Sequence, residues 1–215
     1  YVVQKTRLRS IALTGDSRMQ GFSDTPESAG FNGQLGRALG PYFGVCKLGQ
    51  YSDRLSWFLP YGTVRQQILR YASDVWTNYG INDLNAGGLS AAEHEANILS
   101  LAQIAGSRPL IAMTLTPQTT STDSWATTGN QTISSGTVNT KRISYNNDLR
   151  GGLVPGVSGY IEAADAVESA RDSGIWKAPG YVADGTHETA LGNAAIAAVV
   201  TPAVPLLMAT TAAII

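Results

Sequence analysis

Four side chains in this sequence are of the types that nucleophilic catalysis needs. Ser17 offers a hydroxyl and His187 an imidazole, while Asp184 offers a carboxylate and Asn82 a side-chain amide. Asp184 lies three residues before His187, so a tight turn can bring the carboxylate beside the imidazole. A nucleophile, a base, a group that orients the base and an amide donor are the parts that acyl transfer through a serine requires.

This chemistry depends on the residue types for physical reasons. A serine hydroxyl is a poor nucleophile until a neighbouring base takes its proton, and neutral imidazole can do so near pH 7. A carboxylate on the other ring nitrogen fixes the tautomer and stabilises the imidazolium that forms. When an ester carbonyl becomes tetrahedral, each donor aimed at its oxygen raises the rate by about 10²–10³-fold.

The elements that must position these residues follow from the hydrophobic pattern. Strands are predicted over residues 10–13, 42–48, 74–79, 109–115 and 159–164, and helices over 32–39, 63–72, 90–105, 141–150 and 187–200. Strands that alternate with helices predict a parallel sheet covered on both faces. Ligands of such sheets bind beyond the carboxyl ends of the strands. Ser17 and Asn82 each follow a predicted strand, and His187 precedes the last helix.

The candidate residues lie in four short blocks. In chain order these are Gly15-Asp16-Ser17, residues 48–54, Gly80-Ile81-Asn82-Asp83 and Asp184-Gly185-Thr186-His187. Together they resemble the SGNH hydrolase family, the GDSL esterases and lipases, over nearly the whole chain. The resemblance implies an α/β protein with a flavodoxin-like, parallel five-stranded sheet in a three-layer α/β/α sandwich. It also implies a single domain over residues 1–215 and hydrolysis of carboxylic esters without a cofactor.

The resemblance assigns a role to each block. Ser17 is expected to be the nucleophile, His187 the general base and Asp184 the residue that orients the base. The oxyanion hole is expected to combine the Asn82 side chain with backbone N–H groups, that of Ser17 among them.

The sequence departs from the family pattern at two positions. Arg18 stands where the name GDSL expects leucine, a position that varies. The second block of the family usually ends in a glycine before a polar residue, and here Ser52 occupies that glycine position before Asp53. A serine amide can serve as the donor if φ is not positive. Ser52 is therefore the first choice for the second oxyanion donor, and Gly49 is the alternative.

The substrate class follows less directly from the sequence. We expect a serine esterase that forms an acyl-enzyme and removes small acyl groups, acetyl above all, from carbohydrate or a similar polar substrate. The Ser-, Thr- and Asn-rich segment 116–140 favours a polar substrate over a long-chain lipid. A thioesterase or lysophospholipase is an enzymatic alternative. A carbohydrate-binding or structural module with a degenerate site is the alternative from another class.

Composition argues against several other classes. The 215 residues carry 15 Lys and Arg against 16 Asp and Glu, so no basic surplus exists for nucleic acid or an anionic membrane surface. No membrane span is expected, because Thr201, Pro202 and Pro205 interrupt the apolar C-terminal segment. One cysteine and two histidines argue against a metal centre, so we expect neither metal nor cofactor. The sequence does not indicate an oligomeric state.

The compartment and the chain ends allow only general expectations. Charged residues make up 14% of the chain, and this low share, with abundant Gly, Ser and Thr, favours a secreted or surface protein. The first residue is Tyr1 rather than Met, so we expect either a processed chain or a domain cut from a longer protein.

Several other residues receive structural interpretations. His94 is expected on a solvated helix face, and Cys46 is expected to be an inert core thiol. Residues 116–140 are expected to form a long surface loop, in which Trp125 either stacks on substrate or packs the loop down. One helix face carries a set of polar residues expected to face solvent, namely Arg142, Tyr145, Asn146 and Arg150.

Overall fold

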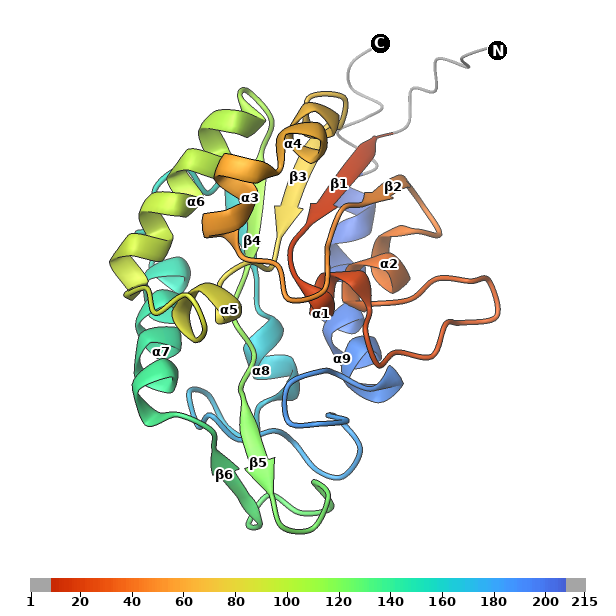
Figure 1. Cartoon of the computed structure of the whole chain (residues 1–215). Coiled ribbons are helices and arrows are strands. Elements are labelled where there is room, and N and C mark those ends of the chain that lie inside the picture. Colours follow the sequence, from red (N-terminus) through yellow and green to blue (C-terminus); the bar gives the residue numbers. More distant parts are fainter. Residues whose placement is uncertain (1–8, 208–215) are drawn as a thin grey trace.

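The computed structural model describes residues 9–207. Its main sheet has five parallel strands in the order β2-β1-β3-β4-β7 (Figure 1). The strands are β1 (Ser10–Thr14), β2 (Gly44–Lys47), β3 (Asp74–Thr77), β4 (Leu110–Met113) and β7 (Gly159–Ile161). Each overlaps one predicted segment, and the prediction of a parallel five-stranded sheet is confirmed.

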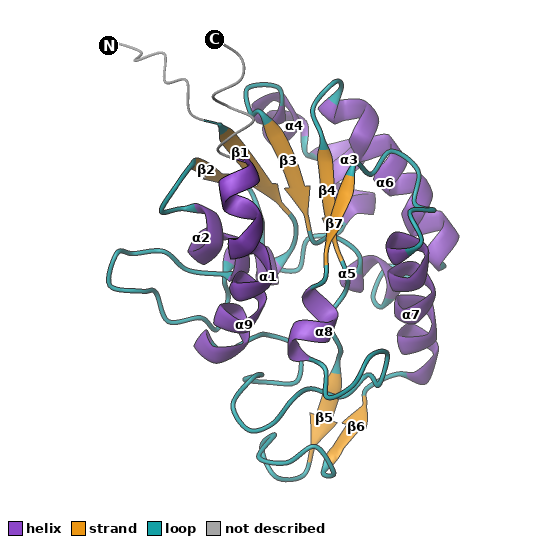
Figure 2. Ribbon diagram, turned by 180° about the vertical axis from the view of Figure 1, so that it is seen from behind, coloured by secondary structure: helices purple, strands orange, loops and turns teal. Residues whose placement is uncertain are grey.

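Helices cover both faces of this sheet. They are α1 (Ser17–Gln20), α2 (Gln34–Leu39), α3 (Leu55–Tyr61), α4 (Thr63–Leu69), α5 (Ile81–Leu84), α6 (Ala91–Ala105), α7 (Gly136–Arg150), α8 (Ala163–Val167) and α9 (Ala190–Val200). One face is covered by α2, α8 and α9 and the other by α3, α4, α6 and α7 (Figures 1 and 2). The three-layer α/β/α sandwich is therefore confirmed.

The alternation of side chains along β1 produces two separate cores. Ile11 and Leu13 belong to the cluster under α2, α8 and α9, whereas Ala12 belongs to the cluster under α3, α4, α6 and α7. All three are fully buried. Successive strand residues point to opposite faces, so a strand buried on both sides is apolar throughout. This central strand ends directly before Gly15-Asp16-Ser17.

The start and end of the longest predicted helix, α6, are confirmed in detail. Ser90 caps α6 by accepting the N–H of Glu93 at 3.2 Å, and the Glu93 carboxylate accepts the N–H of Ser90 at 2.8 Å. This reciprocal capping box satisfies two backbone donors at the helix start. Gly106 ends the helix with φ of 70°, a conformation that glycine adopts without strain.

The segment expected to be a long surface loop contains regular structure. Strands β5 (Thr119–Ser121) and β6 (Gln131–Ile133) form an antiparallel hairpin, and α7 starts at Gly136 rather than near residue 141. Figure 2 shows this hairpin beyond the carboxyl ends of the main strands. Trp125 packs against the first core cluster and donates Nε1 to the Thr119 hydroxyl at 2.9 Å. Of the two roles considered for Trp125, the structure supports packing the segment down.

Two burial predictions were wrong. Cys46 is exposed, because β2 is an edge strand with little cover. His94 is fully buried, because this side of α6 faces α5 and α7, where its ring contacts Tyr145 edge-on with centroids 4.9 Å apart. Local sequence did not reveal which face of either element has a neighbour.

The expected exposure of the α7 face was also wrong. Arg142, Tyr145 and Asn146 are buried, with at most 1% of each exposed. Arg142 donates to the Leu115 carbonyl at 2.9 Å and pairs with the buried Glu168 carboxylate at 2.7 Å. These polar groups tie α7 to the loop after β4 and to the segment after α8.

One helical stretch within the described residues, Ala190–Leu207, is long and apolar enough to cross a membrane by length and composition. A third of this stretch is buried, and α9 packs against α2 and α8. A core helix of a globular protein passes the same test, so the stretch alone is weak evidence for a membrane span.

Candidate active site

Ser17 lies directly beyond the carboxyl end of β1, as the first residue of α1. Asp16 caps this one-turn helix by accepting the N–H of Arg18 at 2.9 Å. The helix ends at Gly21, whose φ of 84° is favourable for glycine. Ser17 is 5% exposed, so its hydroxyl lies recessed at the edge of the sheet.

A second turn brings His187 to this hydroxyl. Nε2 of His187 lies 2.9 Å from Oγ of Ser17, and Nδ1 lies 2.7 Å from Oδ2 of Asp184. Because an ionised carboxylate only accepts hydrogen bonds, Nδ1 carries the proton and Nε2 is free to accept the serine proton. The hydroxyl, imidazole and carboxylate therefore touch in series.

The Asp184 carboxylate is also held by the backbone of its own turn. Its Oδ1 accepts the N–H groups of Thr186 at 2.9 Å and His187 at 2.8 Å. Partial burial raises the pKa of Asp184, but these bonds and the contact with the His187 ring outweigh burial and hold the pKa below its usual value. The carboxylate stays ionised wherever an imidazole can act as a base.

Asn82 lies on α5, which follows β3. Its Nδ2 donates to the Asp53 carbonyl at 3.0 Å. The amide has a second hydrogen that this bond does not use. The neighbouring Asp83 carboxylate accepts the N–H groups of Leu55 and Ser56, each at 2.9 Å, at the start of α3. The block with Asn82 is thus fastened to the block with Ser52.

The backbone of Ser52 differs from the expectation. Its φ is 58°, whereas we expected the Ser52 N–H to serve as an oxyanion donor only if φ were not positive. Serine here adopts the left-handed conformation that glycine favours, which matches the glycine usual at this position of the family pattern. Gly49 packs against the nucleophile turn instead: a Cβ there would lie 3.0 Å from the Asp16 carbonyl oxygen. Both residues stay candidates for the second donor.

Solved structures of similar architecture were compared with the chain. A lipase/acylhydrolase from Enterococcus faecalis is 16% identical with a TM-score of 0.56, covering 91% of this chain and 94% of that chain. A lipolytic G-D-S-L family member from Veillonella parvula is 12% identical with a TM-score of 0.60, covering 89% and 95%. A carbohydrate esterase family 3 protein from Talaromyces cellulolyticus is 14% identical with a TM-score of 0.61, covering 94% and 99%.

The chain has the fold of the SGNH hydrolases. Its amino-acid sequence matches no protein-family model and no curated protein. At 12–16% identity these structures establish the fold alone, so the roles of individual residues depend on the geometry described here.

Sequence reasoning missed the side chain that supports the nucleophile turn of this SGNH fold. Asn78 is buried, and its amide accepts the N–H of Asp16 at 3.2 Å and donates to the Asp16 carboxylate at 3.1 Å. A Cβ on Gly15 would lie 1.8 Å from the Asn78 oxygen, so only glycine fits there. Burial raises the pKa of Asp16 above its usual value.

Arg18, a position expected to vary without consequence, is buried and links the block that contains Ser17 to the segment next to His187. Its guanidinium donates to the carbonyls of Thr116 at 3.2 Å and Pro117 at 3.0 Å, and to the Thr116 hydroxyl. That hydroxyl donates in turn to the buried Glu188 carboxylate at 2.9 Å, next to His187. The departure from leucine at position 18 was a sign in the sequence that this residue has a role. The residues that Arg18 contacts come from distant segments, so the sequence did not reveal them.

A second route joins Arg18 to the turn with the base. The guanidinium lies 5.9 Å from the centroid of the Trp176 ring, and Trp176 Nε1 donates to the Gly185 carbonyl at 3.1 Å. Gly185 has φ of 82°, and a Cβ there would lie 1.9 Å from the Thr119 carbonyl oxygen. The β5–β6 hairpin therefore packs directly on the turn that carries His187.

Two exposed aromatic rings adjoin the base. Phe22 lies 4.6 Å from the His187 ring and Tyr51 6.3 Å, measured between centroids. The two rings are 5.1 Å apart. Neither was singled out in the sequence, where each stands in a polar loop.

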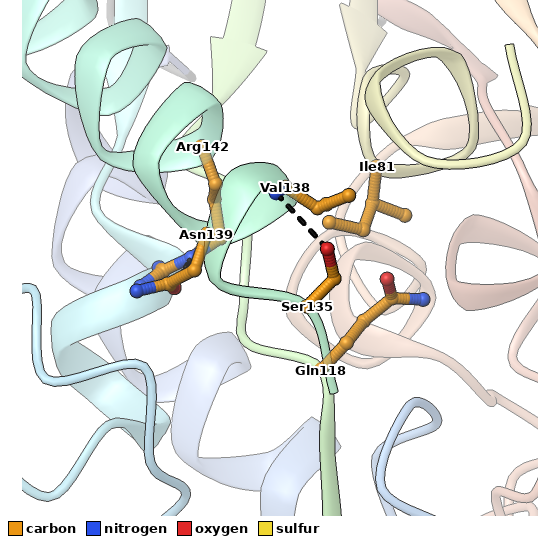
Figure 3. Close-up of a pocket in the computed structure, with 6 residues that line it drawn as sticks. All are labelled: Ile81, Gln118, Ser135, Val138, Asn139 and Arg142. Carbon is orange, nitrogen blue, oxygen red and sulfur yellow. Dashed lines mark hydrogen bonds between the residues drawn. The ribbon is translucent and has the colours of Figure 1, made fainter. Parts of the chain in front are cut away.

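A small pocket lies beside α5 (Figure 3). It is lined by Ile81, Gln118, Ser135, Val138, Asn139 and Arg142. Its polar groups are occupied: Ser135 Oγ accepts the N–H of Val138 at 3.3 Å, and Gln118 Oε1 accepts from Asn85 at 3.1 Å. The pocket is therefore part of the packing around α5, the helix that carries Asn82.

Within residues 9–207, no three side chains of His, Cys, Asp or Glu gather where they could hold a metal ion.

Proposed function

We propose that this protein is a serine-dependent carboxylic ester hydrolase that works through an acyl-enzyme. The observation that carries the proposal is the series of contacts from Ser17 Oγ through His187 to Asp184, at 2.9 Å and 2.7 Å. These groups come from opposite ends of the chain, and the same series is the minimal apparatus for activating a serine.

The acylation step follows from this geometry. Ser17 Oγ attacks the ester carbonyl carbon while its proton passes to Nε2 of His187. The carbonyl oxygen becomes an oxyanion, and Asp184 stabilises the imidazolium on its other side. Collapse of the intermediate breaks the bond to the alcohol oxygen, which takes the proton from Nε2. The alcohol leaves, and the acyl group stays on Ser17.

Deacylation repeats the same steps with water. His187 takes a proton from the attacking water, a second oxyanion forms, and its collapse returns the proton to Ser17 Oγ and releases the carboxylic acid. In both halves the free hydrogen of the Asn82 amide and the Ser17 N–H are proposed oxyanion donors. Ser52 or Gly49 supplies the further backbone donor.

The substrate that we propose is a small acyl ester, acetate above all, on carbohydrate or a similar polar alcohol. Ser17 is 5% exposed and His187 8%, so the acyl carbon must reach a recessed atom, which favours a short acyl group. The nearby β5–β6 hairpin is rich in Thr and Ser, which suits a polar partner. The structural likeness to a carbohydrate esterase is compatible with this class.

The proposal is tested with purified protein and Ser17→Ala. We expect hydrolysis of p-nitrophenyl acetate, acetate release from acetylated xylan, and a loss of about 10³-fold or more in kcat for the variant. Ser100→Ala on α6 is the matched control and should keep full activity. A fluorophosphonate should add its phosphoryl group to Ser17, as detected by mass spectrometry.

Other outcomes favour the alternatives. Faster turnover of long-chain acyl or thioester substrates would replace the acetylesterase assignment with a lipase or thioesterase. Binding of polysaccharide without turnover or labelling would overturn the enzyme proposal in favour of a binding or structural module.

A further inference from the structure

The side of the site next to the base carries an aromatic pair, Phe22 and Tyr51, that the catalytic steps above do not use. Phe22 is 44% exposed and Tyr51 59% exposed. Their rings are tilted by 52° to each other, and the Tyr51 ring is within 21° of parallel to the His187 ring. Large apolar groups left in water beside a reactive group commonly mark a ligand site.

Each ring is fixed to a different catalytic block. Phe22 follows α1, and its N–H donates to the carbonyl of Ser17 at 3.0 Å. Tyr51 immediately precedes Ser52, in the loop where Asp53 N–H donates to the Gln50 carbonyl at 3.3 Å. The backbone that carries each ring therefore belongs to the same turns as Ser17 and Ser52.

The proposed mechanism indicates which part of the ester lies against these rings. His187 must give its proton to the leaving alcohol oxygen, so the alcohol lies on the His187 side of the acyl carbon. The oxyanion lies on the opposite side, towards the Asn82 amide. Because Phe22 and Tyr51 contact the His187 ring, their exposed surfaces border the space that the alcohol occupies.

We propose that Phe22 and Tyr51 form the binding site for the alcohol moiety, and that this alcohol presents a flat, ring-shaped face, as a pyranose does. This inference rests on the proposed ester hydrolase function and deepens it. Aromatic side chains lose little conformational entropy on binding, and because the two rings are tilted by 52° a flat partner can stack on one ring and meet the other at its edge. The phenolic hydroxyl of Tyr51 adds a polar group that suits a hydroxylated ring.

The experiment varies the alcohol at constant acyl group. Methyl acetate, p-nitrophenyl acetate and a mono-acetylated methyl xyloside are compared in the unmodified protein, Phe22→Ala and Tyr51→Ala. Deacylation of the acetyl-enzyme is common to all three substrates, so differences in alcohol binding are measured by kcat/KM. Tyr71→Ala, an exposed tyrosine (87%) at the opposite end of the sheet, is the matched control.

We expect kcat/KM for the two ring-bearing acetates to fall about three- to tenfold in each variant of the pair. The value for methyl acetate should change less than twofold, and the control should match the unmodified protein. An equal loss on all three esters would show that the rings only support His187. In a second series, p-nitrophenyl acetate is compared with p-nitrophenyl butyrate, and a loss in the variants that grows with acyl chain length would assign the rings to the acyl side. Either result overturns the inference.

Binding separates this inference from the function on which it rests. Titration of Ser17→Ala with the acetylated xyloside should show binding that weakens about three- to tenfold when Phe22→Ala is added. If no ester is hydrolysed but this difference persists, the hydrolase proposal fails and the aromatic site stands. If esters are hydrolysed without any dependence on the alcohol, the aromatic site fails alone.

Discussion

Ser52 adopts a backbone conformation that is unfavourable for a residue with a side chain. Its φ of 58° places an L-residue with a side chain in the left-handed region, at a cost of about 1 kcal/mol. The next residue, Asp53, is held firmly, because its carboxylate binds the Tyr79 hydroxyl and Arg65, each at 2.6 Å. Those bonds hold the residue that follows Ser52 in the loop.

Ser52→Gly is therefore expected to raise the free energy of unfolding by about 0.5–1 kcal/mol. Glycine keeps the backbone N–H, so esterase activity should be retained if residue 52 supplies the oxyanion donor. Urea unfolding and kcat for p-nitrophenyl acetate are the measurements. Ser52→Ala keeps the strained conformation and serves as the control; a gain in stability equal to that of glycine would contradict the role of φ.

The contact series of Ser17, His187 and Asp184 could be predicted from the sequence, whereas the residues that support it could not. Ser17, Asp184 and His187 stand in short blocks whose order along the chain is itself informative. The amide of Asn78 and the guanidinium of Arg18 act through partners 62 and about 98 residues away. No local pattern encodes such a pairing, because the partners become neighbours only when the strands align.

At the scale of elements, Arg18 connects α1 with the loop after β4 and, through Glu188, with the start of the segment leading to α9. Replacing it by leucine leaves the buried carbonyls of Thr116 and Pro117 without their donor. Each unsatisfied buried group costs about 1–3 kcal/mol.

We expect Arg18→Leu to lower the free energy of unfolding by at least about 2 kcal/mol. It should also lower kcat for p-nitrophenyl acetate about tenfold or more, with KM nearly unchanged, since small displacements of reacting groups have effects of this size. Arg18→Lys should recover part of kcat. A variant that is destabilised but fully active at low temperature would refute the link between the two turns.

The α6–α7 contact holds two carboxyl groups together. Burial, followed by the charge of Asp148, raises the pKa of Glu95 to about 6. The folded state therefore binds a proton more tightly than the unfolded state does. The contribution of Glu95 to stability is therefore fully present below its ordinary pKa, 4.5, and is lost as the pH rises through about 6.

Glu95→Gln should remove this decline and raise the free energy of unfolding at pH 7 by about 1 kcal/mol, allowing for solvent screening. Chemical denaturation at pH 4.5 and pH 7 is the measurement. Asp148→Asn removes the same repulsion and should give a similar gain, less than additive in the double variant. A stability difference between pH 4.5 and pH 7 that is the same in Glu95→Gln as in the unmodified protein would count against the assignment.

The elements differ in how far they could be predicted. α6 has a capping box, a periodic apolar face and a terminal glycine, and its boundaries were predicted closely. α1, α5 and α8 have four or five residues each, too few for a helical period to be detected. The β5–β6 hairpin was missed because its strands are polar and only three residues long.

At the scale of the whole molecule, two histidines affect function and stability separately. Burial lowers the pKa of His94, although the Asp83 charge and the Tyr79 backbone oppose this effect. The unfolded chain therefore binds the proton more tightly. The contribution of His94 to the free energy of unfolding should therefore be fully present above about pH 6.5 and fall as the pH drops below it, by at most about 1.4 kcal/mol per pH unit.

His94→Leu should flatten the stability profile between pH 5 and about 6.5, as followed by urea unfolding. The same variant should keep its kcat/KM for p-nitrophenyl acetate, because His94 is not part of the contact series from Ser17 to Asp184. His187→Ala should show the reverse: no activity, but the acid decline of stability that His94 causes. If either variant loses both the activity and this acid decline, the two histidines are coupled and the separation is wrong.

The packing of the hairpin on Gly185 has a consequence for how the protein can vary. The hairpin backbone packs so closely on Gly185 that no side chain fits there. A larger residue at position 185 would therefore displace the turn that carries the His187 imidazole. The exposed residues 126–130 at the tip of the hairpin, by contrast, can be exchanged at little cost. New specificities should therefore arise by remodelling these residues, while Trp125 and the contact at the base of the hairpin stay invariant.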